Sequence, residues 1–125
     1  MDASVLMGAW SLVSFTRSQG GVVDTPLGKR PTGLLLYTPD GYMGGFLRKD
    51  PSDTSDVPVL STYAARWTLN GTTMRHDILF NNIESRVGQT VFRHARFEGE
   101  RLLLRTETKQ TPEGEHWMEI TWVRP

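Results

Sequence analysis

The sequence has no cysteine, no long hydrophobic run and no excess of either charge. Without cysteine, disulfides, thiolate metal ligands and cysteine nucleophiles are excluded. Lysine and arginine together number 14, as do aspartate and glutamate. Because nucleic-acid-binding proteins normally carry a basic excess, we expect no nucleic-acid partner. No apolar run approaches the roughly 20 residues that a membrane-spanning helix needs, and residues 1–8 lack the features of a signal peptide, so we expect a cytoplasmic protein with no membrane partner.

Motifs for common catalytic and cofactor sites are also missing. No Gly-x-Ser-x-Gly motif is present, so serine-hydrolase chemistry is not expected. The glycine pairs at 20–21 and 44–45 lack the spacing of a phosphate-binding loop. His76, His94 and His116 are not spaced as metal ligands. We therefore expect neither a metal nor another cofactor.

The most regular pattern lies in residues 33–48, where two short strand-like runs flank a turn. Pro39 presets φ at the first central position of this turn, Asp40 can bond its own backbone, and Gly41 supplies a positive φ. The stretch therefore predicts an antiparallel hairpin. A lone hairpin is barely stable in water, so further strands must accompany it.

The rest of the chain predicts such strands, separated by turn signals. Asn70-Gly71 predicts a type I′ hairpin turn, and residues 3–7 predict a short helical turn. We expect strands at 10–17, 33–37, 42–48, 63–69, 72–80, 88–97, 101–107 and 115–124, with irregular connections at 22–31, 49–58 and 81–87. This pattern predicts one all-β domain over residues 1–125, an antiparallel up-and-down barrel of about eight strands that can hold one small ligand.

The sequence resembles a known family. The similar stretches are 8–15, which begins Gly-x-Trp-x-Leu, 31–43, 88–106 and 120–124. On these residues the chain is similar to the lipocalin-like domain proteins of bacteria and fungi. Two segments depart from the family pattern, because 50–60 is shorter and more polar and 82–86 replaces a Pro-Asn-Trp-like loop.

The resemblance implies a barrel related in shape to lipocalins. It also implies that Trp10 closes one end of the barrel, with Arg124 stacked over its ring. Relatives of this barrel type include cyclases and isomerases of natural-product pathways and carriers of apolar molecules. Fold alone does not decide between these activities.

Strand alternation assigns side chains to the two faces of the sheet. Met74, His76, Ile78 and Phe80 share one face, which we expect to point inward. In residues 88–97, the family pattern turns Arg93 inward, whereas Phe92 favours the opposite face. The hairpin at 33–48 contributes Tyr37 and either Tyr42, Gly44 and Phe46 or the alternate face. We expect the ligand to contact Tyr37, Phe46, Tyr63, Trp67, Met74, Ile78, Leu104 and Trp122.

His76 and Arg93 are the candidate catalytic residues. His76 would take or deliver a proton near neutral pH. Arg93 would hold a carbonyl, enolate or carboxylate oxygen as negative charge develops. In the alternative interpretation, both side chains only satisfy their neighbours inside a filled barrel, since a buried arginine must be paired.

Three functions remain open from the sequence. We expect a cofactor-independent cyclase or isomerase that acts on a largely apolar natural-product intermediate in secondary metabolism, because such chemistry needs mainly a shaped cavity. The first alternative is a carrier or sensor of a hydrophobic small molecule. The second is a filled barrel that acts through its surface, as in a homodimer. The sequence barely separates the first two.

Overall fold

The computed structural model describes residues 1–55 and 60–125, and these residues form strands with two short 3-10 turns, η1 and η2. The elements are η1 (Ala3–Val5), β1 (Gly8–Gln19), β2 (Val22–Asp24), β3 (Thr32–Tyr37), β4 (Tyr42–Arg48), β5 (Tyr63–Asn70), β6 (Thr73–Asn81), η2 (Glu84–Arg86), β7 (Thr90–Glu98), β8 (Arg101–Thr106), β9 (Lys109–Thr111) and β10 (Gly114–Val123). The predicted all-β class and the N-terminal helical turn are confirmed.

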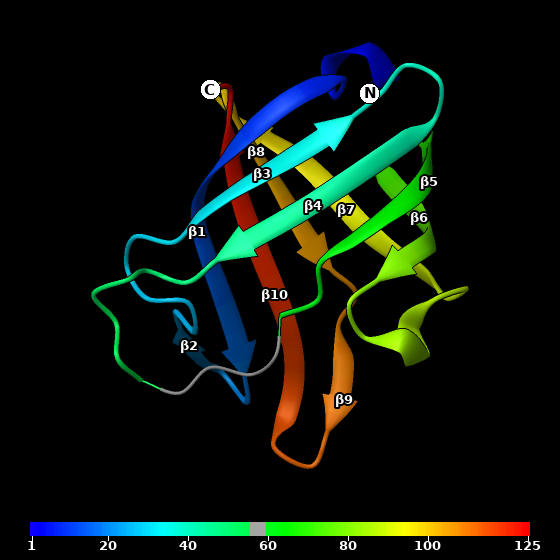
Figure 1. Ribbon diagram of the computed structural model, residues 1–125. Helices are drawn as coiled ribbons and strands as arrows, with labels where there is room; N and C mark the ends of the chain where they lie inside the picture. The colour runs from blue at the N-terminus through cyan, green and yellow to red at the C-terminus, as the bar shows by residue number, and fades with distance from the viewer. Residues whose placement is uncertain (56–59) are drawn as a thin grey trace.

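The strands form one closed antiparallel barrel. Consecutive barrel strands pair in the order β1-β3-β4-β5-β6-β7-β8-β10, and β1 pairs with β10 to close the circle. The barrel therefore has 8 strands. Because it is closed, every barrel strand pairs with a neighbour on each of its two edges over at least part of its length. Strands β2 and β9 extend the sheet at the end of the barrel that lies away from both termini (Figure 1).

Two short strands were not predicted, one within the predicted irregular connection 22–31 and one between the last two predicted strands. β2 pairs with the last residues of β1, where Arg17 and Asp24 form an ion pair at 2.6 Å. β9 pairs with the start of β10. Both strands are too short for a periodic signal in the sequence, and pairing with an overhanging barrel strand stabilises them. The predicted exposed loop at 49–58 lies partly outside the described residues.

One predicted turn is confirmed and the other differs in type. At Thr38–Gly41, the Gly41 N–H donates to the Thr38 carbonyl at 3.2 Å, and Gly41 has φ +94°. At the β5–β6 turn only Gly71 has a positive φ, +62°. A type I′ turn needs a positive φ at both central residues, so that assignment is wrong. Asn70 pairs with Thr73, so the central residues of the turn are Gly71 and Thr72. A glycine of positive φ at the first of these positions is the type II′ arrangement.

A β-bulge in β6 changes the face of its last residues. Ala65 pairs with Ile78 and Ala64 pairs with Phe80, so one residue of β6 is left over between them. Because side chains alternate along a strand, this extra residue turns Phe80 outward. Phe80 is 72% exposed, so the prediction that it points inward is wrong.

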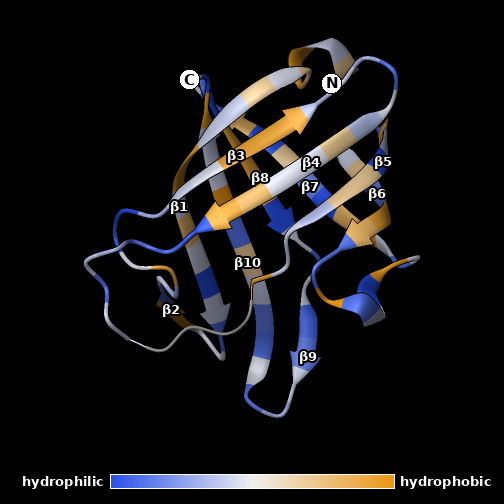
Figure 2. Ribbon diagram, viewed as in Figure 1, coloured by the Kyte–Doolittle hydropathy of each residue, from blue (hydrophilic) through white to orange (hydrophobic). Residues whose placement is uncertain are grey.

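The hairpin of β3 and β4 uses the alternate face. Leu35 and Tyr37 of β3 point inward together with Met43 of β4, and all three are buried. Phe46 lies on the outer face and is 45% exposed, so it does not line the barrel interior with the other predicted ligand contacts. Its ring covers Gly44, where a Cβ atom would lie 3.2 Å from the ring. Figure 2 shows that β3 and β4 are rich in hydrophobic residues, whereas β9 and the adjoining end of β10 are polar.

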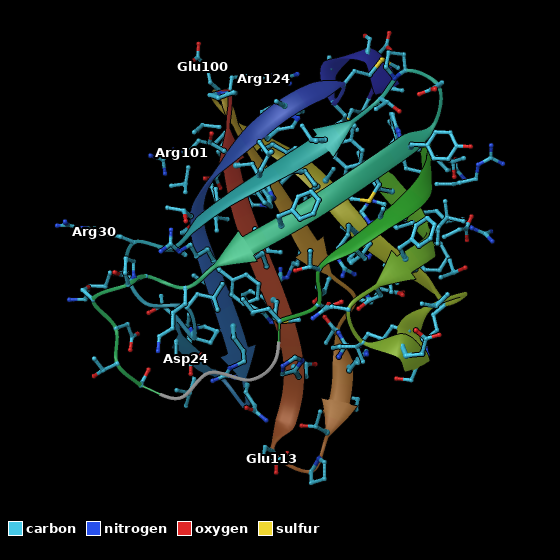
Figure 3. The ribbon with its side chains drawn as sticks, in the orientation of Figure 1. Asp24, Arg30, Glu100, Arg101, Glu113 and Arg124 are labelled. Carbon is cyan, nitrogen blue, oxygen red and sulfur yellow. The ribbon has the colours of Figure 1, made fainter. Side chains whose placement is uncertain are left out.

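One end of the barrel, which we call the capped end, is closed by Trp10. Its Nε1 donates to the Leu6 carbonyl at 2.9 Å, so η1 and its C-cap are held across the barrel. The Arg124 guanidinium stacks 3.7 Å from the centre of the Trp10 ring and donates to the carbonyls of Ala9 and Val5. Arg124 lies at the same end as Arg101 and opposite Glu113 (Figure 3). The predicted structural role of Trp10 and its partner Arg124 is confirmed.

Replacement of Arg124 should destabilise this cap. Arg124→Ala removes the stacking on Trp10 and two hydrogen bonds, so we expect the free energy of unfolding to fall by about 1–2 kcal/mol. Urea unfolding followed by tryptophan fluorescence measures the change. Arg101→Ala, an exposed arginine at the same end, is the control and should change it by less than about 0.5 kcal/mol. Equal losses in both variants would contradict the role of the cap.

Candidate functional site in the barrel interior

The inward-facing side chains differ between the two halves of the barrel. At the capped end, Trp10, Leu102 and Trp122 are at most 2% exposed. Toward the other end, which we call the far end, inward-facing residues keep partial contact with solvent. These half-buried residues are Leu12, Leu47, Tyr63, Val91, Arg93, Thr106, Met118 and Ile120. The far half of the interior is therefore the part that keeps contact with solvent.

A continuous chain of hydrogen bonds crosses this interior. His76 of β6 is 1% exposed, and both of its ring nitrogens are engaged. The Tyr37 hydroxyl lies 2.9 Å from Nε2, and the Tyr63 hydroxyl lies 2.8 Å from Nδ1. Tyr37 is 1% exposed, whereas Tyr63 is half-buried at the start of β5. Three strands, β3, β5 and β6, thus each supply one member of the chain.

Burial keeps this chain uncharged near neutral pH. Burial, together with the charge of Arg93 and against the opposing effect of Asp77, lowers the pKa of His76 to about 3. Burial also raises the pKa of Tyr63, partly opposed by Arg93, and raises that of Tyr37 well above its usual value. His76 is therefore a neutral imidazole that the two tyrosines cover. Its expected role as a direct proton acceptor near neutral pH does not fit this geometry.

Arg93 supplies positive charge to the same interior. It alternates with the buried Ala95 along β7, so it points inward, while Phe92 lies on the other face. One guanidinium nitrogen donates to the Phe92 carbonyl at 2.9 Å. Among the described residues, no carboxylate forms an ion pair with Arg93. No carboxylate of the described residues therefore neutralises this half-buried arginine.

The other predicted ligand contacts, apart from Phe46, form the apolar wall of the barrel interior, and Trp122 belongs to its capped end. Trp67, Met74 and Ile78 point inward and are buried, as are Leu104 and Trp122. The Trp67 indole donates to the Thr38 carbonyl at 3.1 Å, whereas the Trp122 indole N–H has no acceptor among the described residues. Sequence reasoning missed the inward-facing Leu12 and Leu35, and it left open whether Met43 and Leu47 point inward.

A second hollow lies outside the barrel, between Gly28 and Asp50 and their neighbours. The Asp50 carboxylate accepts hydrogen bonds from the Arg30 N–H and from the N–H and hydroxyl of Ser52. These bonds lower the pKa of Asp50. Because the carboxylate is already satisfied by its own loop, we interpret this hollow as a loop junction rather than a ligand site.

The comparisons agree with the fold. The family model described as "Lipocalin-like domain" matches residues 7–61, less than half of the chain. The family resemblance inferred from the sequence is thereby confirmed. Neither the comparison with curated proteins nor the comparison with solved structures gave a match. A lipocalin-like barrel supports the binding of a small hydrophobic molecule.

Within the described residues, no helix is long and apolar enough to span a membrane, and no three acidic or histidine side chains cluster as metal ligands.

The low pKa of His76 predicts a pH-dependent stability. The pKa of His76 is 6.5 in the unfolded protein and about 3 in the native protein. Between these two values, the unfolded protein binds a proton at His76 that the native protein does not. Stability should therefore fall as the pH decreases from 6.5 toward 3, by about 1.4 kcal/mol per pH unit from this group. Urea midpoints at pH 7 and pH 5 should differ more in the wild type than in His76→Gln.

His94 provides the control for this measurement, because it is exposed on the outer face of β7. His94→Gln should retain the wild-type difference between the two pH values. In the wild-type protein, the NMR signals of the His76 ring should also stay unchanged between pH 8 and pH 5. A His76 ring that titrates in this range would contradict the assignment.

Proposed function

We propose that this protein binds a small, largely apolar molecule in the far half of its barrel and catalyses its cyclisation or isomerisation. The observation that supports the proposal is the convergence of Tyr63, His76 and Arg93 in an otherwise apolar interior. We include in the proposal the cytoplasmic location and the role in secondary metabolism that the sequence led us to expect.

The chemistry would rest on stabilisation of a developing oxyanion. Tyr63 stays protonated because burial raises its pKa, so its hydroxyl can donate a hydrogen bond to a substrate carbonyl. Arg93 adds a positive charge at the same place. Donors that are held in position before the reaction stabilise the charge that forms in the transition state, and the apolar wall would fold the substrate into a reactive conformer.

Intramolecular addition of a hydroxyl group to a conjugated ketone is one reaction of this kind. A carbon–oxygen bond forms, the carbonyl oxygen gains negative charge as an enolate, and the hydroxyl proton moves to the α-carbon. The product is an isomer of the substrate, so no oxidant, reductant or cofactor is consumed. Tyr63 and Arg93 would stabilise the enolate oxygen, while His76 would hold the Tyr63 hydroxyl in place.

A long-chain hydroxy-enone that can close a six-membered ring tests this activity. We expect conversion by the wild type, measured as loss of the ultraviolet absorbance of the conjugated ketone. Tyr63→Phe and Arg93→Met should each lower kcat by about 100-fold or more, because each removes a group that acts on the oxyanion. The dissociation constant for the substrate should change much less.

Tyr42→Phe and Arg96→Met are the matched controls, since both residues lie on the outer face of the barrel. Both controls should retain wild-type kcat. If the substrate binds and returns unchanged from the wild-type protein, the catalytic part of the proposal fails. Wild-type kcat in both Tyr63→Phe and Arg93→Met would show that these residues do not act on the substrate.

A carrier of an apolar carboxylate is the second candidate function. It is favoured by the absence of an acidic partner for Arg93 among the described residues. A half-buried guanidinium is best satisfied by a carboxylate, which binds it through charge-assisted hydrogen bonds. Such a protein would hold its ligand at the same site without changing it.

Decanoate and 1-decanol, which share one alkyl chain, test this candidate. Displacement of the fluorescent probe N-phenyl-1-naphthylamine gives both dissociation constants. We expect decanoate to bind about tenfold more tightly than 1-decanol, equivalent to about 1.4 kcal/mol. Arg93→Met should abolish this preference, and Arg96→Met should keep it. No preference in the wild type would contradict a carboxylate ligand.

A further inference from the structure

The side chains of Tyr37, His76 and Tyr63 carry three hydrogens that can form hydrogen bonds, but only two hydrogen bonds join them. A neutral imidazole carries one N–H and one lone pair, and each tyrosine adds one hydroxyl hydrogen. The two links, at 2.9 Å and 2.8 Å, use two of these three hydrogens. One tyrosine must donate to the ring and the other must accept from it. The accepting tyrosine keeps a hydroxyl hydrogen for another partner.

The surroundings of the two tyrosines decide which one keeps it. Tyr37 is 1% exposed, and among the described residues its hydroxyl bonds only to His76. A free hydrogen there would be a buried donor without an acceptor, which native structures avoid. Tyr63 is half-buried at the far end, where its hydroxyl can meet a ligand.

We propose that the chain is fixed in one direction and that Tyr63 presents its hydroxyl hydrogen to the ligand. Tyr37 donates to Nε2 of His76, and the Nδ1–H of His76 donates to the Tyr63 oxygen. Tyr63 touches the ligand, while Tyr37 and His76 are positioning residues. The inference rests on the proposed binding of a ligand in the far half of the barrel.

The direction of the chain defines the chemical class of the ligand. The Arg93 guanidinium also only donates hydrogen bonds, so the guanidinium and the Tyr63 hydroxyl hydrogen both require an acceptor. Asn81, which lies inward opposite Tyr63, is engaged by Ser61 and by the Ile83 N–H. The site therefore selects an apolar molecule whose polar atom is an acceptor oxygen, such as a ketone, rather than a donor such as an amine.

The first experiment measures the tautomer of His76 directly. In ¹⁵N-labelled wild-type protein, NMR correlation of the ring nitrogens should show Nδ1 protonated and Nε2 unprotonated. Tyr37→Phe removes the donor to Nε2, so the second tautomer should become populated. Tyr42→Phe, on the outer face, should leave the ring unchanged. Protonated Nε2 in the wild type would overturn the proposed direction, whether or not the protein has any catalytic activity.

The second experiment tests what Tyr63 presents to the ligand. Carbonyl-labelled 2-decanone is bound to the protein, and its infrared C=O band is compared with that in hexane. We expect a shift to lower frequency in the wild type. The shift should be much smaller in Tyr63→Phe. In Arg93→Met, the part of the shift that the Tyr63 hydroxyl causes should remain. It should also shrink in Tyr37→Phe, although residue 37 does not touch the ligand.

The outcomes separate this inference from the proposed function. A bound ketone whose band is the same in the wild type and in Tyr63→Phe would overturn the role of Tyr63. An unchanged tautomer and band in Tyr37→Phe would overturn the positioning role of Tyr37. Failure of 2-decanone and related ketones to bind would instead refute the proposed binding function, and the tautomer measurement would still decide the direction of the chain.

Discussion

The pairing of β1 with β10 is the constraint on which the rest of the structure depends. It joins the first and last barrel strands from Ser11 to Gln19, and without it the sheet would have two open edges and an exposed interior. The same pairing brings Trp10 and Arg124, from opposite ends of the chain, into contact at the capped end. Closure and capping are therefore one event, and it involves the most distant parts of the sequence.

Closure buries a polar group that side chains of other strands must satisfy. His76 is held by one tyrosine from β3 and one from β5, so the register of these strands is fixed by hydrogen bonds as well as by apolar packing. A slip of one residue in β6 would turn His76 to the outer face. The bulge in β6 then places Asn81 rather than Phe80 opposite Tyr63. It removes a large ring from the far end of the interior and keeps that end polar.

Local signals in the sequence predicted the strands and most of their faces, but not the bulge or the links between strands. The turn at Thr38–Gly41 is set by residues adjacent in the chain, so it was predictable. The exposure of Phe80 depends on one extra residue in the β5–β6 ladder, which leaves no mark on the hydrophobic pattern. Phe46 could not be placed because hydrophobic residues occur on both faces of its hairpin. Tyr37 and His76 are 39 residues apart, and their contact joins two strands, β3 and β6, that are not neighbours in the sheet.

The two halves of the barrel divide stability and binding between them. At the capped end, the Trp10 ring and its indole N–H are fully used by neighbouring groups. In the far half, Arg93 has no acidic partner among the described residues, and Tyr63 retains contact with solvent. A half-buried cation and hydroxyl without full hydrogen bonding lower the stability of the empty protein. A ligand that supplies an acceptor oxygen satisfies both groups at once. The free energy that the empty protein lacks because these hydrogen bonds are missing is then gained on binding, and it adds to the affinity for that ligand.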